Sequence, residues 1–420
     1  MEQRSWRARG LAWQYRHWSL KRRAANGENA GLSDMGLQST SKNWVKWYRR
    51  HLADPLKNFR RQLRRGALHP GLAFSYQGFR RAVECCDWED AHRRLTPLAM
   101  SALKANDLKL LTEMAFSAER LGEHEKSLEW HVAVAERSAK RPESEWTIGD
   151  LADATLLVKF MESEKQGLAI GLNMAGYVAE AAAKAGRCSL VVEKRLVPLF
   201  QRTIPDIEVV AYPGVPEPKP NESPLVANPL TLKRVLGATP EDIGRRFLPL
   251  KSSPEETAEL RKRYLGGRDL PLIGISWWSS HFGKDLPSVE DWADYLRMTE
   301  AVFVSIQYGD IDADLEILKA AAPGRFVVDD SVDQMKDMDR FASQLGALDS
   351  VATISNTGAH LAGAMGIPTS LIRDDWFRRQ WPVREDRTPW YPNTRVFGRD
   401  DREWLAVFRD IKAAGGDIQR

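Results

Sequence analysis

Short apolar runs alternate with stretches of helical periodicity from residue 154 to the end of the chain. Each run has the length of a buried strand, and most are followed by a segment whose apolar positions repeat with helical spacing. The runs cover residues 154–161, 189–193, 208–212, 272–277, 302–308, 326–330, 351–355 and 370–374, and helices are expected around 171–185, 196–202 and 254–264. Strands that alternate with helices predict parallel sheets joined by right-handed crossovers.

A proline-rich interval at residues 213–229 divides these runs into two sets. Each set predicts one Rossmann-like domain, so the fold class is α/β, with two Rossmann-like domains facing each other across a cleft. Ligands of such sheets bind at the carboxyl ends of the strands. The residues that directly follow each run are therefore the candidates for a binding site.

The region from residue 69 to residue 142 is helical by its periodicity. Residues 110–138 form a helical hairpin that breaks at Gly122, and a weaker copy with Asp87 and Trp88 at its turn lies about 36 residues upstream. This region resembles tetratricopeptide repeats. Two interpretations stay open, namely a groove for an acceptor or partner and a helical collar packed on the next domain.

Residues 350–368 have the layout of an anion cradle. A short strand pattern runs into a polar turn of Asn356, Thr357 and Gly358, and a helix rich in small residues follows with His360 in its first turns. Unpaired backbone N–H groups at such a helix start attract phosphate oxygens. The alternative is an ordinary strand-to-helix connection with a capping Asn or Thr, in which His360 is a core residue.

The first 66 residues carry the basic excess of the chain. They hold 16 Lys or Arg against 4 Asp or Glu, a net charge of +12, while the whole chain has +4, so the remainder carries −8. A polar linker is expected at residues 24–41. This mixture suits a solvated or internally packed arm, or contact with an acidic protein or a membrane surface, and nucleic acid is least favoured. Tryptophans interleave with these cations at Trp6, Trp13, Trp18, Trp44 and Trp47.

Composition narrows the class of protein. A chain of 420 residues with 43% hydrophobic and 28% charged residues suits a globular protein of more than one domain. We find no apolar run of the ~20 residues that would span a bilayer, and the amino terminus lacks a secretory signal, so we expect a cytoplasmic protein. The three cysteines, Cys85, Cys86 and Cys188, lack the spacing of a metal site or a disulfide framework.

The carboxyl half resembles a known family. From about residue 272 it is similar to the bacterial tetratricopeptide-linked glycosyltransferases of the GT-B fold, which are related to the lipopolysaccharide heptosyltransferases and to the O-linked N-acetylglucosamine transferases. The resemblance is weaker over residues 154–212. The matching segments are IGISWWSS (273–280), GKDLPSVEDWADYL (283–296), VSIQYGD (304–310), the long segment at 327–372 and REDRTPWYPNTRVF (384–397).

This resemblance implies a domain order and a set of donor contacts. The substrate would be a nucleotide-sugar, the acceptor a protein or a glycan, and no cofactor or metal ion would be needed. The expected parts are a basic arm (1–66), tetratricopeptide-like repeats (67–145), an acceptor domain (146–250), a nucleotide-sugar domain (251–400) and a last helix that crosses back onto the acceptor domain (401–420). The expected donor contacts are Ser276, Lys284, Gln307, Tyr308, Asn356, Thr357, Gly358 and His360.

One departure from the family concerns catalysis. Aligned without gaps to residues 166–178, the family loop has an aspartate, the general base of heptosyltransferases, where this chain has Ile170. An isoleucine cannot take a proton, and a positioned base contributes roughly 10²- to 10⁴-fold to a rate. Glu162 and Glu164 are substitute candidates or simply surface carboxylates. Two hypotheses follow: a glycosyltransferase, or a GT-B-derived binding or scaffold protein with impaired turnover.

Overall fold

The computed structural model describes residues 70–84, 87–138, 146–160, 171–216, 223–236, 240–279, 286–309, 311–373, 381–383, 386–399 and 402–418. The chain divides into two compact units, residues 1–73 and 74–420. The basic arm expected at residues 1–66 lies outside the described residues. The predicted boundaries between the domains stay predictions.

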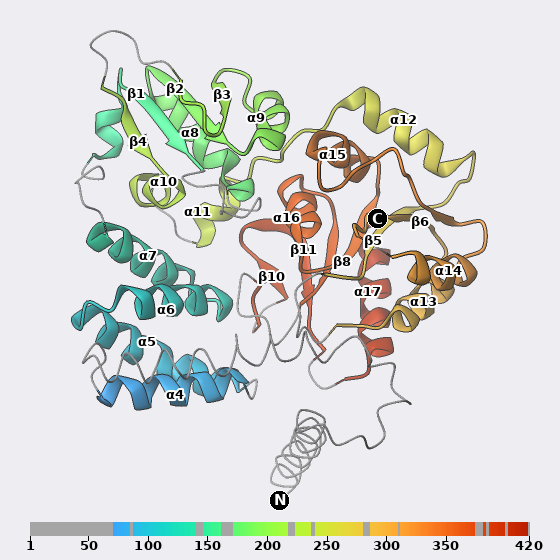
Figure 1. Cartoon of the computed structure of the whole chain (residues 1–420), viewed down its shortest axis with the longest axis horizontal. Coiled ribbons are helices and arrows are strands. Elements are labelled where there is room, and N and C mark those ends of the chain that lie inside the picture. The colour runs from blue at the N-terminus through green and yellow to red at the C-terminus, as the bar shows by residue number, and fades with distance from the viewer. Residues whose placement is uncertain are drawn as a thin grey trace, which may run out of the picture. The chain divides into compact units, whose positions relative to one another are not determined.

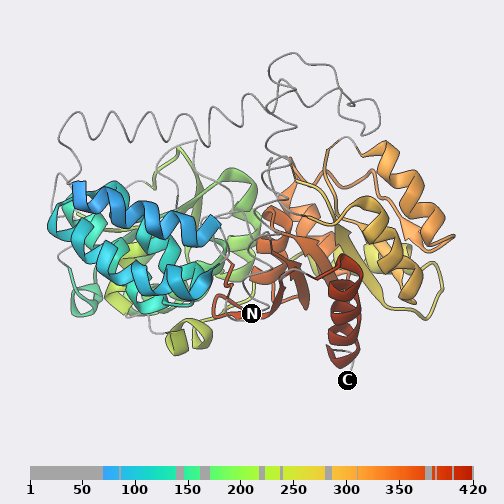
Figure 2. The same cartoon turned by 90° about the horizontal axis from the view of Figure 1, so that it is seen from below.

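The helical region follows the periodicity of its sequence. It contains α4 (Pro70–Glu84), α5 (Trp88–Lys104), α6 (Leu108–Arg120) and α7 (His124–Ser138), and Figures 1 and 2 show α5, α6 and α7 stacked side by side. Asp87 caps α5 by accepting from the backbone N–H of Asp90, and Asp107 caps α6 by accepting from that of Leu110. Gly122 has φ +82°, a left-handed conformation that glycine adopts without strain. The expected break between two helices at Gly122 is therefore confirmed.

The first sheet has the strand order β3-β2-β1-β4, and every pairing in it is parallel. Strands β1, β2 and β3 match predicted runs, whereas β4 lies inside the proline-rich interval, where three residues give too short a pattern to recognise. The elements are η3 (Ile148–Leu151), β1 (Thr155–Lys159), η4 (Leu172–Met174), α8 (Ala175–Lys184), β2 (Arg187–Val192), η5 (Lys194–Leu196), α9 (Val197–Thr203), β3 (Glu208–Ala211), β4 (Leu225–Ala227), α10 (Pro229–Leu236) and α11 (Pro240–Arg245).

The second sheet has the order β10-β11-β9-β8-β5-β6-β7, parallel except for the antiparallel pair β10–β11. Counted from β5, the parallel part reads 3-2-1-4-5-6, which is the doubly wound Rossmann order. The strands are β5 (Leu272–Ser276), β6 (Val302–Ser305), β7 (Phe326–Val327), β8 (Ser350–Ile354), β9 (Thr369–Ile372), β10 (Arg387–Thr388) and β11 (Tyr391–Phe397). The helices are α12 (Pro254–Leu265), α13 (Val289–Met298), α14 (Asp312–Ala321), α15 (Met338–Gly346), α16 (Thr357–Ala364) and α17 (Trp404–Ile418).

Both faces of the second sheet are covered by helices. Along β5, Leu272 belongs to one apolar core with α12, α15 and α16, whereas Ile273 and Ile275 belong to a second core with α13, α14 and α17. Side chains of a strand alternate between its two faces, which explains this division. A Cβ at Gly274 would lie 2.5 Å from Leu348 Cδ1, so a larger residue there would displace the end of the Leu348 side chain, which lies between α15 and β8. The predicted α/β class with two parallel sheets is confirmed.

The last helix corrects one expectation. We expected it to cross back onto the acceptor domain, but α17 packs on α13 of the second domain, beside which Figure 1 shows it. Phe408 lies edge-on to Trp292, with ring centroids 4.9 Å apart, and stacks on Tyr295 at 5.1 Å. The apolar face of α17 completes the core on that side of the second sheet, which is why the helix stays with this domain.

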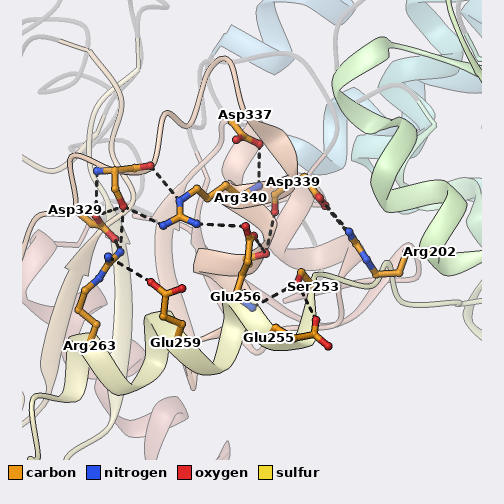
Figure 3. Close-up of polar contacts among 12 residues, drawn as sticks. Arg202, Ser253, Glu255, Glu256, Glu259, Arg263, Asp329, Asp337, Asp339 and Arg340 are labelled. Carbon is orange, nitrogen blue, oxygen red and sulfur yellow. Dashed lines mark hydrogen bonds and ion pairs between the residues drawn. The ribbon is translucent and has the colours of Figure 1, made fainter.

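Polar contacts join the first sheet's helices to the second domain (Figure 3). Arg202 of α9 donates two hydrogen bonds to the carboxylate of Asp339 at the start of α15, at 2.8 and 3.0 Å. Within the second domain, Glu256 of α12 accepts from Arg340 at 3.3 Å and from Ser343 at 2.9 Å, both on α15. These hydrogen bonds hold α15 in place, together with the layer of helices that includes α16.

Candidate functional site

Three of the predicted site residues, Ser276, Gln307 and Asn356, meet at the switch point of the second sheet. Strands β5 and β8 are neighbours there, and their crossovers leave in opposite directions, which is where Rossmann sheets bind ligands. Ser276 ends β5, and Asn356 follows β8. Asn356 Nδ2 donates to Ser276 Oγ at 2.8 Å, although the two residues are 80 positions apart.

Gln307 holds the loops at this edge together. Its Oε1 accepts from Ser276 Oγ and from the backbone N–H groups of Trp277 and Trp278, each at 2.8 Å. Its Nε2 donates to the carbonyls of Trp278 at 3.1 Å and Tyr308 at 2.9 Å. The side chain is buried and its hydrogen bonds are used within the protein. Gln307 thus positions the β5 and β6 loops.

The first turn of α16 presents backbone N–H groups at the same edge. Asn356 is the N-cap, and its Oδ1 accepts from the N–H of Ala359 at 3.0 Å. The N–H groups of Thr357 and Gly358 precede the first intrahelical donor, the N–H of His360, and both residues are half-buried. A Cβ at Gly358 would lie 3.3 Å from both Asn356 Oδ1 and Phe341 Cζ, so glycine suits the tight packing of the turn. Together with the macrodipole, these groups favour an anion.

His360 lies in an aromatic cluster behind this turn. Its ring stacks on Trp381 with centroids 4.8 Å apart, and its Nδ1 lies 3.1 Å from the hydroxyl of Tyr391. Trp381 Nε1 donates to Ser355 Oγ at 2.8 Å, which ties the cluster to the end of β8. Burial raises the pKa of Tyr391, so the phenol is neutral. His360 is thus buried beside the cradle, and its role as a donor contact stays a prediction.

Trp278 is a candidate that sequence reasoning did not single out. It directly follows β5, its side chain is 42% exposed, and it lies edge-on to the half-buried Tyr308 with centroids 6.0 Å apart. Gly309, with φ +98°, lets the chain turn beneath the Trp278 ring. The two rings offer an aromatic surface at the carboxyl edge. In the sequence, Trp278 could be found only by its position directly after the apolar run at residues 272–277.

Two titratable residues, Lys233 and Glu119, lie next to the aromatic cluster. Lys233 of α10 has its Nζ 3.9 Å from the ring centroid of Trp390, and Trp390 adjoins Tyr391. Burial lowers the pKa of Lys233 while the carboxylate of Glu119 acts in the opposite direction. Burial likewise raises the pKa of Glu119 on α6. The helical region, the first sheet and the β10–β11 hairpin therefore converge on one side of the cradle.

Four of the predicted residues lie outside the described part of the chain: Lys284, the base candidates Glu162 and Glu164, and Ile170. Their roles stay predictions. Among the described residues, no three His, Cys, Asp or Glu side chains gather as a metal ion would require, and no helix there is long and apolar enough to cross a membrane.

No protein-family model matches the chain. Protein FlbA of Caulobacter vibrioides is 27% identical over 301 residues, which are 66% of this chain and 49% of that protein. The chain thus spans about half the length of the curated relative it matches.

Three solved structures overlap with part of the chain at low similarity. One is a family 9 glycosyl transferase from Veillonella parvula, with a TM-score of 0.46 and 12% identity over 64% of this chain and 98% of that one. Another is the E. coli ADP-heptose lps heptosyltransferase II, with a TM-score of 0.41 and 10% identity over 64% of this chain and all of that one. A third is E. coli heptosyltransferase WaaC with ADP-2-deoxy-2-fluoro heptose, with a TM-score of 0.39 and 12% identity over 63% and 99%.

Proposed function

We propose that the chain transfers a sugar from a nucleotide-sugar donor to a protein or glycan acceptor, without a metal ion, in the manner of GT-B glycosyltransferases. The observation that carries this proposal is the meeting of Ser276, Gln307 and Asn356 at the switch point of the second sheet, beside the first turn of α16. A nucleotide-sugar brings two phosphates, and this is the place where a Rossmann sheet holds them.

The donor's parts match different groups of the site. The diphosphate lies against the N–H groups of Thr357 and Gly358 and accepts a hydrogen bond from the Thr357 hydroxyl, and stabilisation of its developing charge favours departure of the nucleotide. The nucleoside lies against the aromatic pair of Trp278 and Tyr308. Lys284 supplies a countercharge to the diphosphate. Ser276 and Gln307 hold the loops in the geometry that the donor needs.

A second function fits the same site. Because Ile170 stands where the related enzymes have their general base, the chain is alternatively a binding or scaffold protein with impaired turnover. Donor activation at the diphosphate is independent of that base. Nucleotide binding is therefore expected under both functions, and only turnover distinguishes them. Glu162 and Glu164 are the residues to test as substitute bases.

The test is a thermal-shift screen of the full chain with ADP, UDP, GDP, CMP and their sugars, followed by an assay for nucleotide release with protein and glycan acceptors. Stabilisation by one nucleotide-sugar with release supports the transferase. Stabilisation without release under every acceptor supports the scaffold. Absence of stabilisation by all of these compounds overturns both functions.

A matched pair of variants locates the site. Thr357→Val removes a hydroxyl from the first turn of α16, and Thr257→Val makes the same change in the first turn of α12, where the hydroxyl contacts Ser252 at 3.0 Å. We expect Thr357→Val to weaken nucleotide affinity about tenfold, the effect of one hydrogen bond to a charged group. Thr257→Val should leave the affinity unchanged. Equal affinity in both variants would show that the donor binds elsewhere.

A further inference from the structure

The C-terminal end of α6 contacts a segment that backs the cradle. The carbonyl of Arg120, the last residue of α6, accepts from the backbone N–H of Val383 at 3.0 Å. The last carbonyls of a helix have no partner within the helix, so Val383 satisfies one of them. Two residues before Val383, Trp381 stacks on His360 of α16 and donates to Ser355 Oγ directly after β8. Through this segment, the end of α6 is joined to both the helix and the strand of the cradle.

Glu119, one residue earlier on α6, lies beside a second such segment, the β10–β11 hairpin. Burial raises the pKa of Glu119 and lowers that of Lys233, and each residue draws the pKa of the other back toward its charged form. The N–H of Trp390 acts on Glu119 from beyond hydrogen-bond distance, and it too lowers the pKa of that carboxyl. Lys233 Nζ lies 3.9 Å from the centroid of the Trp390 ring. A cation over an indole is held more strongly when it is shielded from water, as Lys233 is.

The hairpin passes this contact on to α16. Tyr391, the neighbour of Trp390, has its hydroxyl 3.1 Å from His360 Nδ1. A Cβ at Gly363 would lie 2.7 Å from the Tyr391 ring, so the ring lies against the helix there as well. Tyr391 therefore touches α16 on two successive turns, directly behind the turn that presents the cradle N–H groups.

Lys233 reaches the hairpin from a third part of the chain. It belongs to α10, which packs on α7 of the helical region and on β4 of the first sheet (Figure 1). The helical region, the first sheet and the second sheet thus meet at the Trp390 ring. No local feature of α6 or α10 requires a carboxylate and an ammonium to be held there, away from water, where each costs free energy unless it is compensated.

We propose that the end of α6 positions the donor cradle, with Glu119 and Lys233 as positioning residues that act through Trp390 and Tyr391. The helical region is then a collar packed on the next domain, one of the two interpretations that its sequence left open. This inference rests on the proposed function, because it concerns the donor site. The position of α16 can nevertheless be measured without a nucleotide.

Hydrogen–deuterium exchange of the full chain measures how firmly α16 (Thr357–Ala364) is held. The native chain is compared with Glu119→Gln, which keeps the shape of the side chain, and with Lys233→Met, which keeps most of its length. We expect the amides of α16 to exchange about threefold to tenfold faster in each variant, the effect of losing a shielded cation–π contact. Far-UV circular dichroism shows that each variant folds, and Glu119→Gln decides the test where Lys233→Met does not fold.

Matched controls make the same chemical changes at exposed positions. Glu125→Gln lies on α7 and Lys184→Met on α8, and both should leave the exchange of α16 unchanged. Lys233→Arg keeps a cation over the ring, so it should restore most of the protection that Lys233→Met loses. Packing alone does not predict this rescue, because methionine fills the space of lysine more closely than arginine does.

Nucleotide affinity supplies a second readout, with ADP and UDP as the probes in isothermal titration calorimetry. We expect Glu119→Gln and Lys233→Met to weaken binding about threefold or more, and the two controls to leave it unchanged. A native chain that binds none of the nucleotides of the screen contradicts the proposed function, whereas the exchange of α16 still decides whether the end of α6 positions that helix.

Three outcomes overturn the inference. The first is native exchange of α16 in both Glu119→Gln and Lys233→Met. The second is equally fast exchange in the controls, which would indicate a general loss of stability. The third is loss of protection in Lys233→Met and Lys233→Arg alike with none in Glu119→Gln, which would make Lys233 a packing residue only. Faster exchange of α16 with unchanged nucleotide affinity refutes the role in donor binding.

Discussion

Gln307 shows how one residue organises the candidate site. Its amide joins the chain after β5 to the chain after β6 through an oxygen that accepts three hydrogen bonds and a nitrogen that donates two. The sequence placed Gln307 at the end of a strand and favoured contact with a ligand. In the structure this side chain holds the two loops together, because the oxygen and the nitrogen of its amide are both hydrogen-bonded within the protein.

Replacement of Gln307 by leucine should destabilise the protein. Gln307→Leu leaves the N–H groups of Trp277 and Trp278 without their acceptor, and an unsatisfied buried donor costs about 1–3 kcal/mol. We expect the free energy of unfolding in urea to fall by about 2–4 kcal/mol. Asn393→Ala is the control, since its exposed amide donates a single bond, to the carbonyl of Gly366, and should cost less than about 1 kcal/mol. Equal losses in the two variants would contradict the role given to Gln307.

At the scale of elements, the α6–α7 hairpin encloses two histidines in an environment that disfavours their charge. His131 lies edge-on to Phe116 of α6, with ring centroids 4.7 Å apart, and its Nδ1 contacts the carbonyl of Ser127 at 2.8 Å. Burial lowers the pKa of His131 to about 4, and Lys233 of α10 acts in the same direction. Burial and Lys233 also lower the pKa of His124. The hairpin is therefore built for neutral histidines.

This environment predicts acid sensitivity. The pKa of His131 is about 4 in the folded chain and about 6.5 when unfolded, so the unfolded state binds the proton more readily. The stability from neutral His131 is full above about pH 6.5 and is lost as the pH falls toward about 4, with a slope of up to about 1.4 kcal/mol per pH unit. In urea titrations between pH 4.5 and 8, His131→Gln should show a flatter dependence than the native chain. An unchanged slope would mean that His131 is protonated equally in both states.

At the scale of the molecule, α9 of the first sheet's layer and α15 of the second sheet's layer contact each other. The contact includes an ion pair as well as apolar side chains. One apolar core contains Leu199 and Phe200 of α9 together with Phe341 of α15. Arg202 and Asp339 join the same two helices, with side chains only 28% and 27% exposed. Asp339 raises the pKa of Arg202, which marks a favourable pairing. This contact sets the position of α9 against the domain that carries the cradle.

A double-mutant cycle should detect this pairing. For Arg202→Ala, Asp339→Ala and the double variant, we expect a coupling free energy of about 1 kcal/mol or somewhat more, because the bonds are paired and partly buried. The coupling should weaken only modestly in 0.5 M NaCl. The same cycle at Arg297 and Asp294, an exposed pair within α13, should give less than about 0.5 kcal/mol. Equal coupling at both pairs would refute the proposed contribution of the interdomain contact.

The sequence predicted the site in part. Asn356 was expected at a helix start, and it caps α16, because a capping side chain bonds within its own turn and needs no distant partner. Trp278 was missed because an exposed aromatic after a strand has no distinctive local pattern. The strands β10 and β11 were also missed, since neither forms an uninterrupted apolar run. The position of α17 was predicted wrongly, because its apolar face fits either domain by sequence alone.

The sequence by itself determined the strands that are uninterrupted apolar runs, the break at Gly122 and the polar turn before α16. These features follow from interactions between residues a few positions apart, and periodicity and capping report them directly. Only the tertiary structure decided that Ser276, Gln307 and Asn356 share one hydrogen-bonded cluster and that His360 packs among aromatic rings. Those contacts join residues tens of positions apart. The order of the strands and the packing of the helices set them, and no local pattern encodes either.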